Sequence, residues 1–336
     1  MSLLTFTPQG IYCEQGKFYI DPWQPVENAI ITHAHADHSR QGMKNYMAHN
    51  DSEPVMRLRL GSDINLETVA YGKKTIINGV EVSLHPAGHI IGSAQVRAAF
   101  KGEVWVASGD YKLEQDETVT PFEPVKCDHF ITESTFGLPV FEWQSSKTIF
   151  NEINNWWLKN KSEGKTSVLV CYALGKAQRI LKGIDSSIGE IYAHGSICNI
   201  QRLFIENGFK FPGVHYAGAE VEKQKYEGAL VLTTNSVLGT NWSRRFKSYS
   251  LAYASGWMAM RGSRRRRAAD VGFVLSDHAD WQGLNEAVKL TGAENIYVTH
   301  GYTNIFARWL NEQGYNAQEV QTEFTGESID AQSEEE

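Results

Sequence analysis

The stretch "AIITHAHADHSRQG", residues 29–42, places three histidines and an aspartate within six positions, directly behind a short apolar run. These residues are His33, His35, Asp37 and His38. In an extended or looped segment, residues i and i+2 point the same way, so His33 and His35 can converge on one cation while Asp37 and His38 face a neighbouring one. Imidazole and carboxylate ligands together suit Zn²⁺ and tolerate Mn²⁺ or Fe²⁺. The stretch therefore predicts two adjoining sites for divalent cations.

Two catalytic cations need more ligands than one loop offers, so further His and Asp residues are expected at the ends of other strands. His89 lies in "HPAGHIIGS" behind the apolar run 79–85, and Asp110 lies in "WVASGDYK" behind the run 103–107. His300 ends the apolar segment "NIYVTH". Side chains at strand ends can meet at one edge of a sheet, which is where binding sites are often built.

The rest of the chain alternates between strand-like and helix-like patterns, which predicts an α/β fold. Early strands follow one another through short glycine-containing turns, which indicates antiparallel sheet. From about residue 143 to 264 the alternation is typical of a parallel unit, so two modules are expected. The apolar runs cover 28–32, 79–85, 94–100, 103–108, 129–133, 166–171, 190–194, 229–234, 272–276 and 295–300, and the helical patterns cover 145–161, 175–184, 196–207, 281–290 and 303–314.

Composition indicates a protein of the cytoplasm. The 336 residues are 42% hydrophobic, enough for a sizeable core. The four cysteines, Cys13, Cys127, Cys171 and Cys198, form no Cys-x-x-Cys pair, which argues against a structural zinc knuckle and against a disulfide framework. Neither a signal peptide nor a membrane-spanning run is apparent, so no membrane association is expected.

Charge is unevenly distributed along the chain. The net charge is −7, but residues 323–336 carry six carboxylates and no base, which predicts a disordered acidic tail. The remaining 322 residues hold 33 acidic and 32 basic side chains. The segment "MRGSRRRRAAD" concentrates cations that can bind a phosphate backbone, namely Arg261, Arg264, Arg265, Arg266 and Arg267. A solvated charged loop is the alternative explanation.

Three motifs resemble the successive metal motifs of the metallo-β-lactamase-fold hydrolases: His-x-His-x-Asp-His at 33–38, Gly-His-x-x-Gly-Ser at 88–93 and Ser-Gly-Asp at 108–110. The resemblance implies an αβ/βα sandwich with a two-metal site at its edge. Because this fold supports many reactions, thiolesterases, lactonases and lactamases would fit the first motif equally well.

Later segments are similar to the additional motifs of the β-CASP nucleases, the branch that contains ribonuclease J, the mRNA cleavage and polyadenylation endonuclease and Artemis. These segments are "FITESTFG" (130–137), "SDHAD" (276–280) and "YVTHG" (297–301), with "YALGKAQRIL" (172–181) resembling part of the inserted β-CASP domain. Over nearly the whole length, the chain most resembles the bacterial ligase-associated DNA exonuclease family, which is also described as mRNA 3′-end processing factor-like. The implied division is a metallo-β-lactamase domain over 1–142 and 265–322, an inserted β-CASP domain over 143–264, and the acidic tail.

The resemblance also assigns roles to the site residues. One metal would take His33, His35 and His89, the other Asp37, His38 and His300, with Asp110 bridging. Water activated by two metals, zinc or manganese, would attack phosphorus. His278 would be the general acid and Glu133 would orient it, although a purely structural role for either stays open. Tyr12 and Asp21 are expected to support the site from outside the ligand set.

The expected substrate is nucleic acid, with DNA favoured over RNA. Family resemblance favours a DNA exonuclease in DNA repair, functionally associated with a DNA ligase and a helicase. His300 instead resembles the RNA-processing members, since the eukaryotic DNA-repair members typically have valine there. The alternatives are therefore an RNA-processing nuclease, a small-molecule metallohydrolase, or a catalytically silent scaffold that binds nucleic acid.

Overall fold

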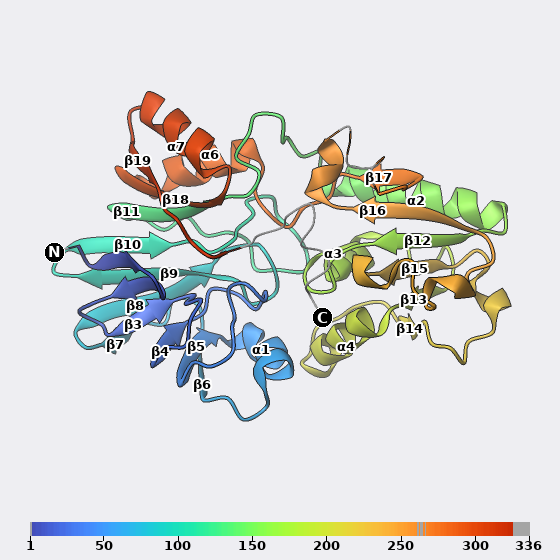
Figure 1. Ribbon diagram of the computed structural model, residues 1–336, viewed down its shortest axis with the longest axis horizontal. Helices are drawn as coiled ribbons and strands as arrows, with labels where there is room; N and C mark the ends of the chain where they lie inside the picture. Colours follow the sequence, from blue (N-terminus) through green and yellow to red (C-terminus); the bar gives the residue numbers. More distant parts are fainter. Residues whose placement is uncertain (1, 261, 263–264, 266, 325–336) are drawn as a thin grey trace. The chain divides into compact units, whose positions relative to one another are not determined.

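The computed structural model of the protein describes residues 2–260, 262, 265 and 267–324 (Figure 1). These residues form two compact units. Residues 2–142 and 277–324 belong to unit 1, and the described residues of 143–276 belong to unit 2. Unit 1 is therefore built from both ends of the chain.

The first sheet of unit 1 has the strand order β1-β2-β3-β4-β5-β6. β1 to β3 pair antiparallel through short turns, whereas β3 to β6 pair parallel. The strands are β1 Leu4–Thr7, β2 Gly10–Cys13, β3 Phe18–Ile20, β4 Asn28–Ile30, β5 Asn45–His49 and β6 Leu66–Val69, and helix α1 (Glu53–Leu60) joins the last two.

The second sheet of unit 1 has the order β19-β18-β11-β10-β9-β8-β7. β8, β9 and β10 pair antiparallel, as the short glycine turns predict, and β11, β18 and β19 add in parallel. The strands are β7 Thr75–Ile77, β8 Val80–Pro86, β9 Ala94–Phe100, β10 Glu103–Ala107, β11 His129–Ser134, β18 Asn295–Gly301 and β19 Asn316–Glu319.

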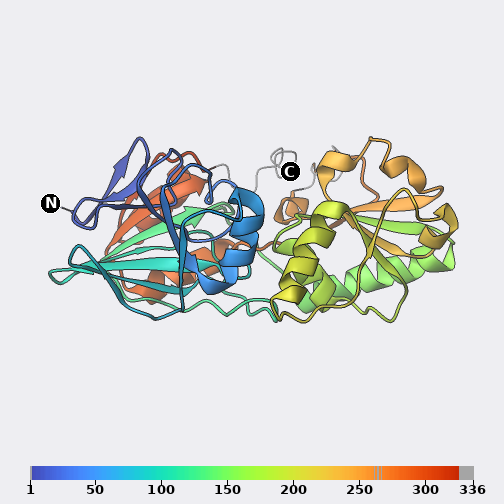
Figure 2. The same cartoon turned by 90° about the horizontal axis from the view of Figure 1, so that it is seen from below.

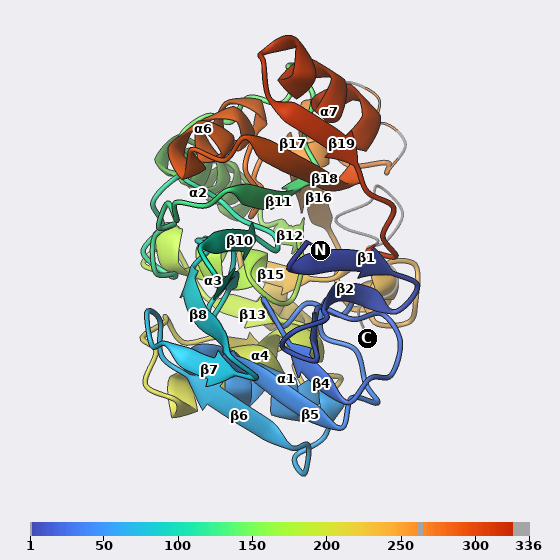
Figure 3. The ribbon, with the colours of Figure 1, turned by 90° about the vertical axis from the view of Figure 1, so that its left-hand side faces the viewer.

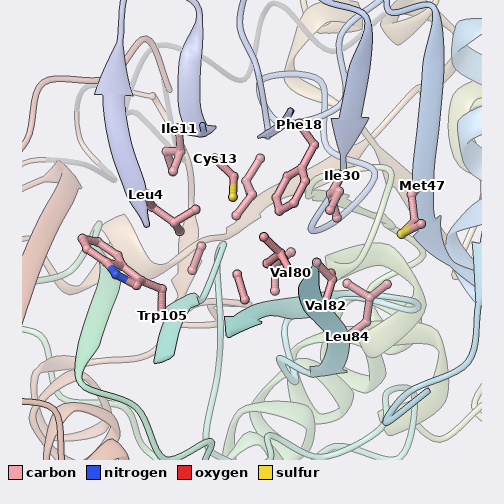
Figure 4. Packing of buried hydrophobic residues seen from close by; sticks show 14 of the residues in the cluster. Leu4, Ile11, Cys13, Phe18, Ile30, Met47, Val80, Val82, Leu84 and Trp105 are labelled. Carbon is pink, nitrogen blue, oxygen red and sulfur yellow. The ribbon is translucent and has the colours of Figure 1, made fainter. Parts of the chain in front are cut away.

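The two sheets of unit 1 pack face to face over one apolar core (Figures 3 and 4). Side chains alternate along a strand, so Trp105 and Ala107 of β10 enter this core while Val106 points to the other face. That other face is covered by α6 (Trp281–Thr291) and α7 (Thr303–Glu312), which Figure 1 shows beside β18. The architecture is the αβ/βα sandwich of the metallo-β-lactamase fold.

Unit 2 is an α/β domain with an all-parallel sheet of order β14-β13-β15-β12-β16-β17. Figure 2 shows its helices, α2 (Ser146–Ser162), α3 (Lys176–Gly183) and α4 (Gly195–Glu206), beside the sheet. Its strands are β12 Thr166–Val170, β13 Ile191–Ala193, β14 His215–Tyr216, β15 Leu230–Thr233, β16 Tyr249–Ala254 and β17 Val271–Phe273. No helix within the described part of the chain combines the length and apolarity needed to cross a bilayer.

The return from unit 2 to unit 1 lies between residues 276 and 277, beyond the expected boundary at 264. β17 explains the difference, because it pairs with β16 and so extends the parallel sheet of unit 2 to Phe273. The start of the expected tail also shifts, since Glu323 and Phe324 make defined contacts in unit 1. The rest of that tail, 325–336, lies outside the described residues.

Candidate metal centre

The loop behind β4 carries three buried imidazoles, those of His33, His35 and His38. The His35 carbonyl accepts hydrogen bonds from the backbone N–H groups of His38 at 3.2 Å and Ser39 at 2.8 Å. This turn reverses the chain directly after the third histidine. Side chains that an extended strand would spread apart are therefore gathered in one place.

Asp21, directly after β3, anchors the loop. One of its carboxylate oxygens accepts the Thr32 N–H at 2.7 Å, and the other accepts the Thr32 hydroxyl at 2.5 Å and lies 2.7 Å from His38 Nδ1. A carboxylate on one ring nitrogen fixes the tautomer that presents the other nitrogen to a metal. Asp21 thus has the supporting position expected of it, whereas Tyr12 packs on Tyr19 with ring centroids 4.5 Å apart.

One set of potential ligands comprises His33, His35, His89 and Asp110, all buried and with ligand atoms within 4.8 Å of one another. Asp110 Oδ2 lies 3.5 Å from His33 Nε2 and 3.8 Å from His89 Nε2. His89 is oriented from behind by its Nδ1, which lies 2.9 Å from the Asp277 carbonyl oxygen. These are nitrogen and oxygen donors in a number that fits one divalent cation.

A second set shares Asp110 with the first and adds His38 and His300. Asp110 Oδ2 is 3.7 Å from His38 Nε2, and Asp110 Oδ1 is 2.9 Å from His300 Nε2. Asp37 adjoins this set through its Oδ2, 3.8 Å from His38 Nε2. A carboxylate common to both sets is the arrangement expected of a residue that bridges two metals.

Several polar atoms at the junction of the two sets have no hydrogen-bond partner among the described residues. They are buried and include His33 Nε2 and His38 Nε2. A buried polar atom left unpaired costs free energy comparable to a lost hydrogen bond, so two such nitrogens facing one carboxylate call for a ligand. The sets therefore fit a pair of metal ions by donor type, number and burial.

Electrostatics at the junction also favour cations. Burial holds the pKa of His33 and His89 well below the ordinary imidazole range, so both are neutral donors. Burial alone would also lower the pKa of His38, but nearby carboxylates, first Asp110 and then Asp37, outweigh it and raise the pKa to about 10. Without a metal, a proton on His38 balances these carboxylates, and a divalent cation can take its place.

Beside the junction, His278 is bonded to a buried carboxylate. Its Nδ1 lies 2.9 Å and 3.1 Å from the two oxygens of Glu133, and Glu133 also accepts the backbone N–H of Tyr111 at 2.8 Å. His278 Nδ1 is 3.9 Å from Asp110 Oδ2. This pairing orients the imidazole, as a general acid requires.

Gly109 lets the chain between β10 and Asp110 approach the histidine-bearing loop closely. Gly109 has a φ of 58°, and a Cβ there would lie 2.6 Å from the Thr32 hydroxyl oxygen. Any side chain would therefore push Thr32 away from Asp21 or displace Asp110. The Ser-Gly-Asp motif requires its glycine for this close approach.

A solved structure, the crystal structure of a protein of unknown function from Enterococcus faecalis V583, has the same fold. Its TM-score is 0.60, with 12% sequence identity over 88% of this chain and 79% of that chain. No family model matches the chain.

Sequence relatives are more specific. The protein named Probable DNA ligase from Opitutus terrae is 27% identical over 311 residues, which cover 92% of this chain and 30% of that protein. Endoribonuclease YSH1 from Kluyveromyces lactis is 22% identical over 72% of this chain and 39% of its own length. Cleavage and polyadenylation specificity factor subunit 3 from Dictyostelium discoideum is 32% identical over 36% of this chain and 16% of its own length.

The described chain combines the expected fold with buried histidine–aspartate sets. In its motifs, its fold and its sequence relatives, the chain is similar to the metallo-β-lactamase-fold β-CASP family. It spans 30% of the Opitutus protein and 39% of the Kluyveromyces protein.

The described residues of the arginine run, Arg265 and Arg267, belong to unit 2 and not to the metal sets. Arg261, Arg264 and Arg266 lie outside the described residues. Arg265 is exposed, and the Arg267 guanidinium lies over the Tyr253 ring, 4.9 Å from its centroid. Phosphate binding by this run stays a prediction.

One contact at the candidate metal centre was not expected. Phe324 stacks on the ring of His38, with centroids 4.3 Å apart and planes at 9°. No local pattern indicates this contact, because Phe324 falls among the acidic residues expected to form a tail and its partner is 286 positions away in the chain.

Proposed function

We propose that the chain is a metal-dependent phosphodiesterase that degrades DNA from its ends in DNA repair. The observation that supports hydrolysis most directly is Asp110 shared between two sets of buried histidines, with His33 Nε2 and His38 Nε2 lacking hydrogen-bond partners within the described residues. Phosphoryl transfer at paired metals needs such a shared carboxylate and little other covalent chemistry from the protein.

In this proposal His33, His35 and His89 hold one ion and Asp37, His38 and His300 the other, with Asp110 between them. Zinc suits this imidazole-rich donor set best, and manganese is the alternative. When bound, the pair would supply an activated water near neutral pH and neutralise charge on the phosphoryl oxygens.

His278 then supplies the proton that the leaving oxygen needs. Glu133 accepts from Nδ1, so Nε2 is the ring nitrogen from which the proton would leave. Glu133 is buried and holds the imidazole in this orientation through the bond to Nδ1. Asp110, Glu133 and His278 form a further group that could hold a metal ion, but in this proposal His278 donates a proton instead.

DNA is favoured as the polymer because a relative that covers 92% of this chain bears the name Probable DNA ligase. This chain matches 30% of that protein, which leaves ample length for a ligase in the same polypeptide. Trimming an end and then sealing it are successive operations on one DNA, so a functional association with a ligase is part of the proposal. Association with a helicase and a cytoplasmic location stay predictions.

RNA is the second candidate, favoured by the relatives named as endoribonucleases and by His300. The metal chemistry does not distinguish the sugars, since no described contact identifies a 2′-hydroxyl. The two candidates differ in the polymer and in the mode of attack, and both differences can be measured in one assay.

The test uses matched single-stranded DNA and RNA labelled at the 5′ or the 3′ end, with a circular single-stranded DNA beside them. Purified protein is supplied with Zn²⁺ or Mn²⁺, and Asp110→Asn and Asp37→Ala serve as controls. A DNA ladder that requires both carboxylates, with the circle intact, would support the proposal. Cleavage of RNA alone would favour the second candidate, and no cleavage by zinc-loaded protein would exclude both.

A further inference from the structure

After β19 the chain runs back along unit 1 to the metal centre. Val320 donates its backbone N–H to the Val298 carbonyl at 2.9 Å, which continues the pairing of β19 with β18. Four residues on, Phe324 reaches His38. We use the name C-terminal strap for residues 320–324.

Arg40 fastens the strap to the histidine loop. Its guanidinium donates to the Glu323 carbonyl at 2.8 Å and lies 3.5 Å from the Glu323 carboxylate. The same side chain donates to the carbonyls of Asp37 at 3.3 Å and Trp23 at 3.2 Å. One arginine therefore ties the strap to the backbone that carries Asp37 and His38.

Phe324 touches two rings of one ligand set. Besides stacking on His38, it meets His300 edge to face, with centroids 5.6 Å apart and planes at 75°. The Trp23 ring also contacts Phe324 edge to face, with centroids 5.5 Å apart and planes at 86°. His38 and His300 belong to the set completed by Asp110, and Phe324 lines a cavity at that set with Asp21 and Thr32.

The side from which Phe324 contacts His38 determines whether the strap blocks metal binding or permits it. A ring stacked at 9° covers the face of the imidazole, whereas a metal binds to the nitrogen lone pair in the ring plane. His38 Nε2 has no hydrogen-bond partner among the described residues and lies 3.7 Å from Asp110, so the strap leaves the donor atom available. The bond from Asp21 to Nδ1 restrains rotation of the His38 ring within its own plane. The stacked Phe324 ring restrains tilting of the His38 ring out of that plane.

We propose that Phe324 is a positioning residue for the metal held by His38, Asp110 and His300. It holds two of the three ligands in place and excludes water from their outer side. The proposal rests on the metal centre of the proposed function, and it further requires that the two sites respond differently to a change in the strap.

The test measures zinc binding by the full-length protein in competition with a graded chelator, with zinc alone as the probe. Phe324→Ala is compared with Phe324→Tyr, which keeps the ring. Phe6→Ala is the matched control, because Phe6 also packs on a partly buried ring, that of Tyr297 at 5.4 Å. Circular dichroism and Tm establish that each variant is folded.

An aromatic contact of this kind predicts that Phe324→Ala raises the Kd of one of the two zinc ions by roughly 2- to 10-fold and leaves the Kd of the other unchanged. Phe324→Tyr and Phe6→Ala should bind both ions as the wild type does. Equal weakening of both ions, unchanged binding, or faster DNA cleavage with unchanged binding would overturn the positioning role. A wild-type protein that binds no zinc would instead overturn the metal centre itself.

Discussion

At the scale of single residues, the carboxylate of Asp21 decides which nitrogen His38 can offer to a metal. In Asp21→Asn, an amide NH₂ turned toward Nδ1 would favour the tautomer that carries its proton on Nε2, the intended donor. We expect the zinc at the His38 set to bind about 10- to 100-fold more weakly. Chelator competition measures this, with the exposed Asp63→Asn as control. Loss of zinc equally from both sites would contradict the assignment.

His278 should affect turnover without affecting metal. If it is the general acid, His278→Ala lowers kcat on the preferred polymer by about 10²- to 10⁴-fold, because the leaving oxygen departs without a positioned proton donor. Zinc content should stay at the wild-type level, as measured by elemental analysis of dialysed protein. A variant that loses zinc in proportion to activity would make His278 a ligand instead.

That these histidines and aspartates lie together was predictable, because such residues at strand ends are chemically conspicuous; their role as metal ligands stays a prediction. All seven proposed ligands lie at the junction of the two sets or, for Asp37, beside it. Phe324 was not predictable, since a phenylalanine shows no ligand chemistry and its contact with His38 arises only from the return of the chain after β19. Sequence reveals donor atoms more readily than it reveals the apolar groups that hold them.

At the scale of elements, the pairing of β11 with β18 places His300. Gly301, opposite Ser134, has a φ of 90°, and a Cβ there would lie 2.3 Å from the Ser134 carbonyl oxygen. Ser134 also donates its hydroxyl to the His300 carbonyl at 2.7 Å. The end of β18 is therefore packed too closely against β11 to accept any side chain.

Gly301→Ala should consequently destabilise the protein and loosen His300. Gly102→Ala is the matched control, because Gly102 has the same φ of 90° but no neighbouring atom within 4 Å of a Cβ. The control should lower the free energy of unfolding by about 1–2 kcal/mol through φ alone. Gly301→Ala should exceed it and also weaken zinc binding at the His38 set. Equal losses in a denaturant titration would show that the clash is relieved without consequence.

Element prediction from sequence depended on apolar content. The strongly apolar β8, β9, β10, β12 and β15 were expected within a residue or so of their bounds. Helix α1, with the sequence "EPVMRLRL", was missed because its eight residues bury only Val55 and Met56 and so give little periodicity. β14 and β19 were missed as well, since both are short, exposed edge strands held by backbone pairing.

At the scale of the whole molecule, both ligand sets lie in unit 1 while unit 2 has a core of its own. Bound metal should therefore stabilise unit 1 selectively, by about 2.7 kcal/mol per site at a free concentration 100 times the Kd. Calorimetry with and without a chelator should show one transition that moves and one that does not. A single transition that moves as a whole would show that the two units unfold together.

The expected end of the insert at 264 precedes the boundary in the structure. The arginine-rich segment suggested an end there, whereas the strand that follows it still belongs to unit 2. "GFVLS" was recognised as strand-like, but sequence alone could not assign it to the sheet of unit 2. Pairing of Ala252 with Val271 decides the assignment, and such a partner cannot be inferred from local pattern.

The division of unit 1 between the two ends of the chain also governs when the protein can first become active. A ribosome delivers His33 to Asp110 early, then all of unit 2, and only afterwards His278 and His300. Until those last residues emerge, the nascent chain holds an incomplete donor set and no proton donor. Under the proposed function, chains abandoned before His300 is made would therefore lack a complete donor set, so the order of synthesis delays the proposed activity until that residue is in place.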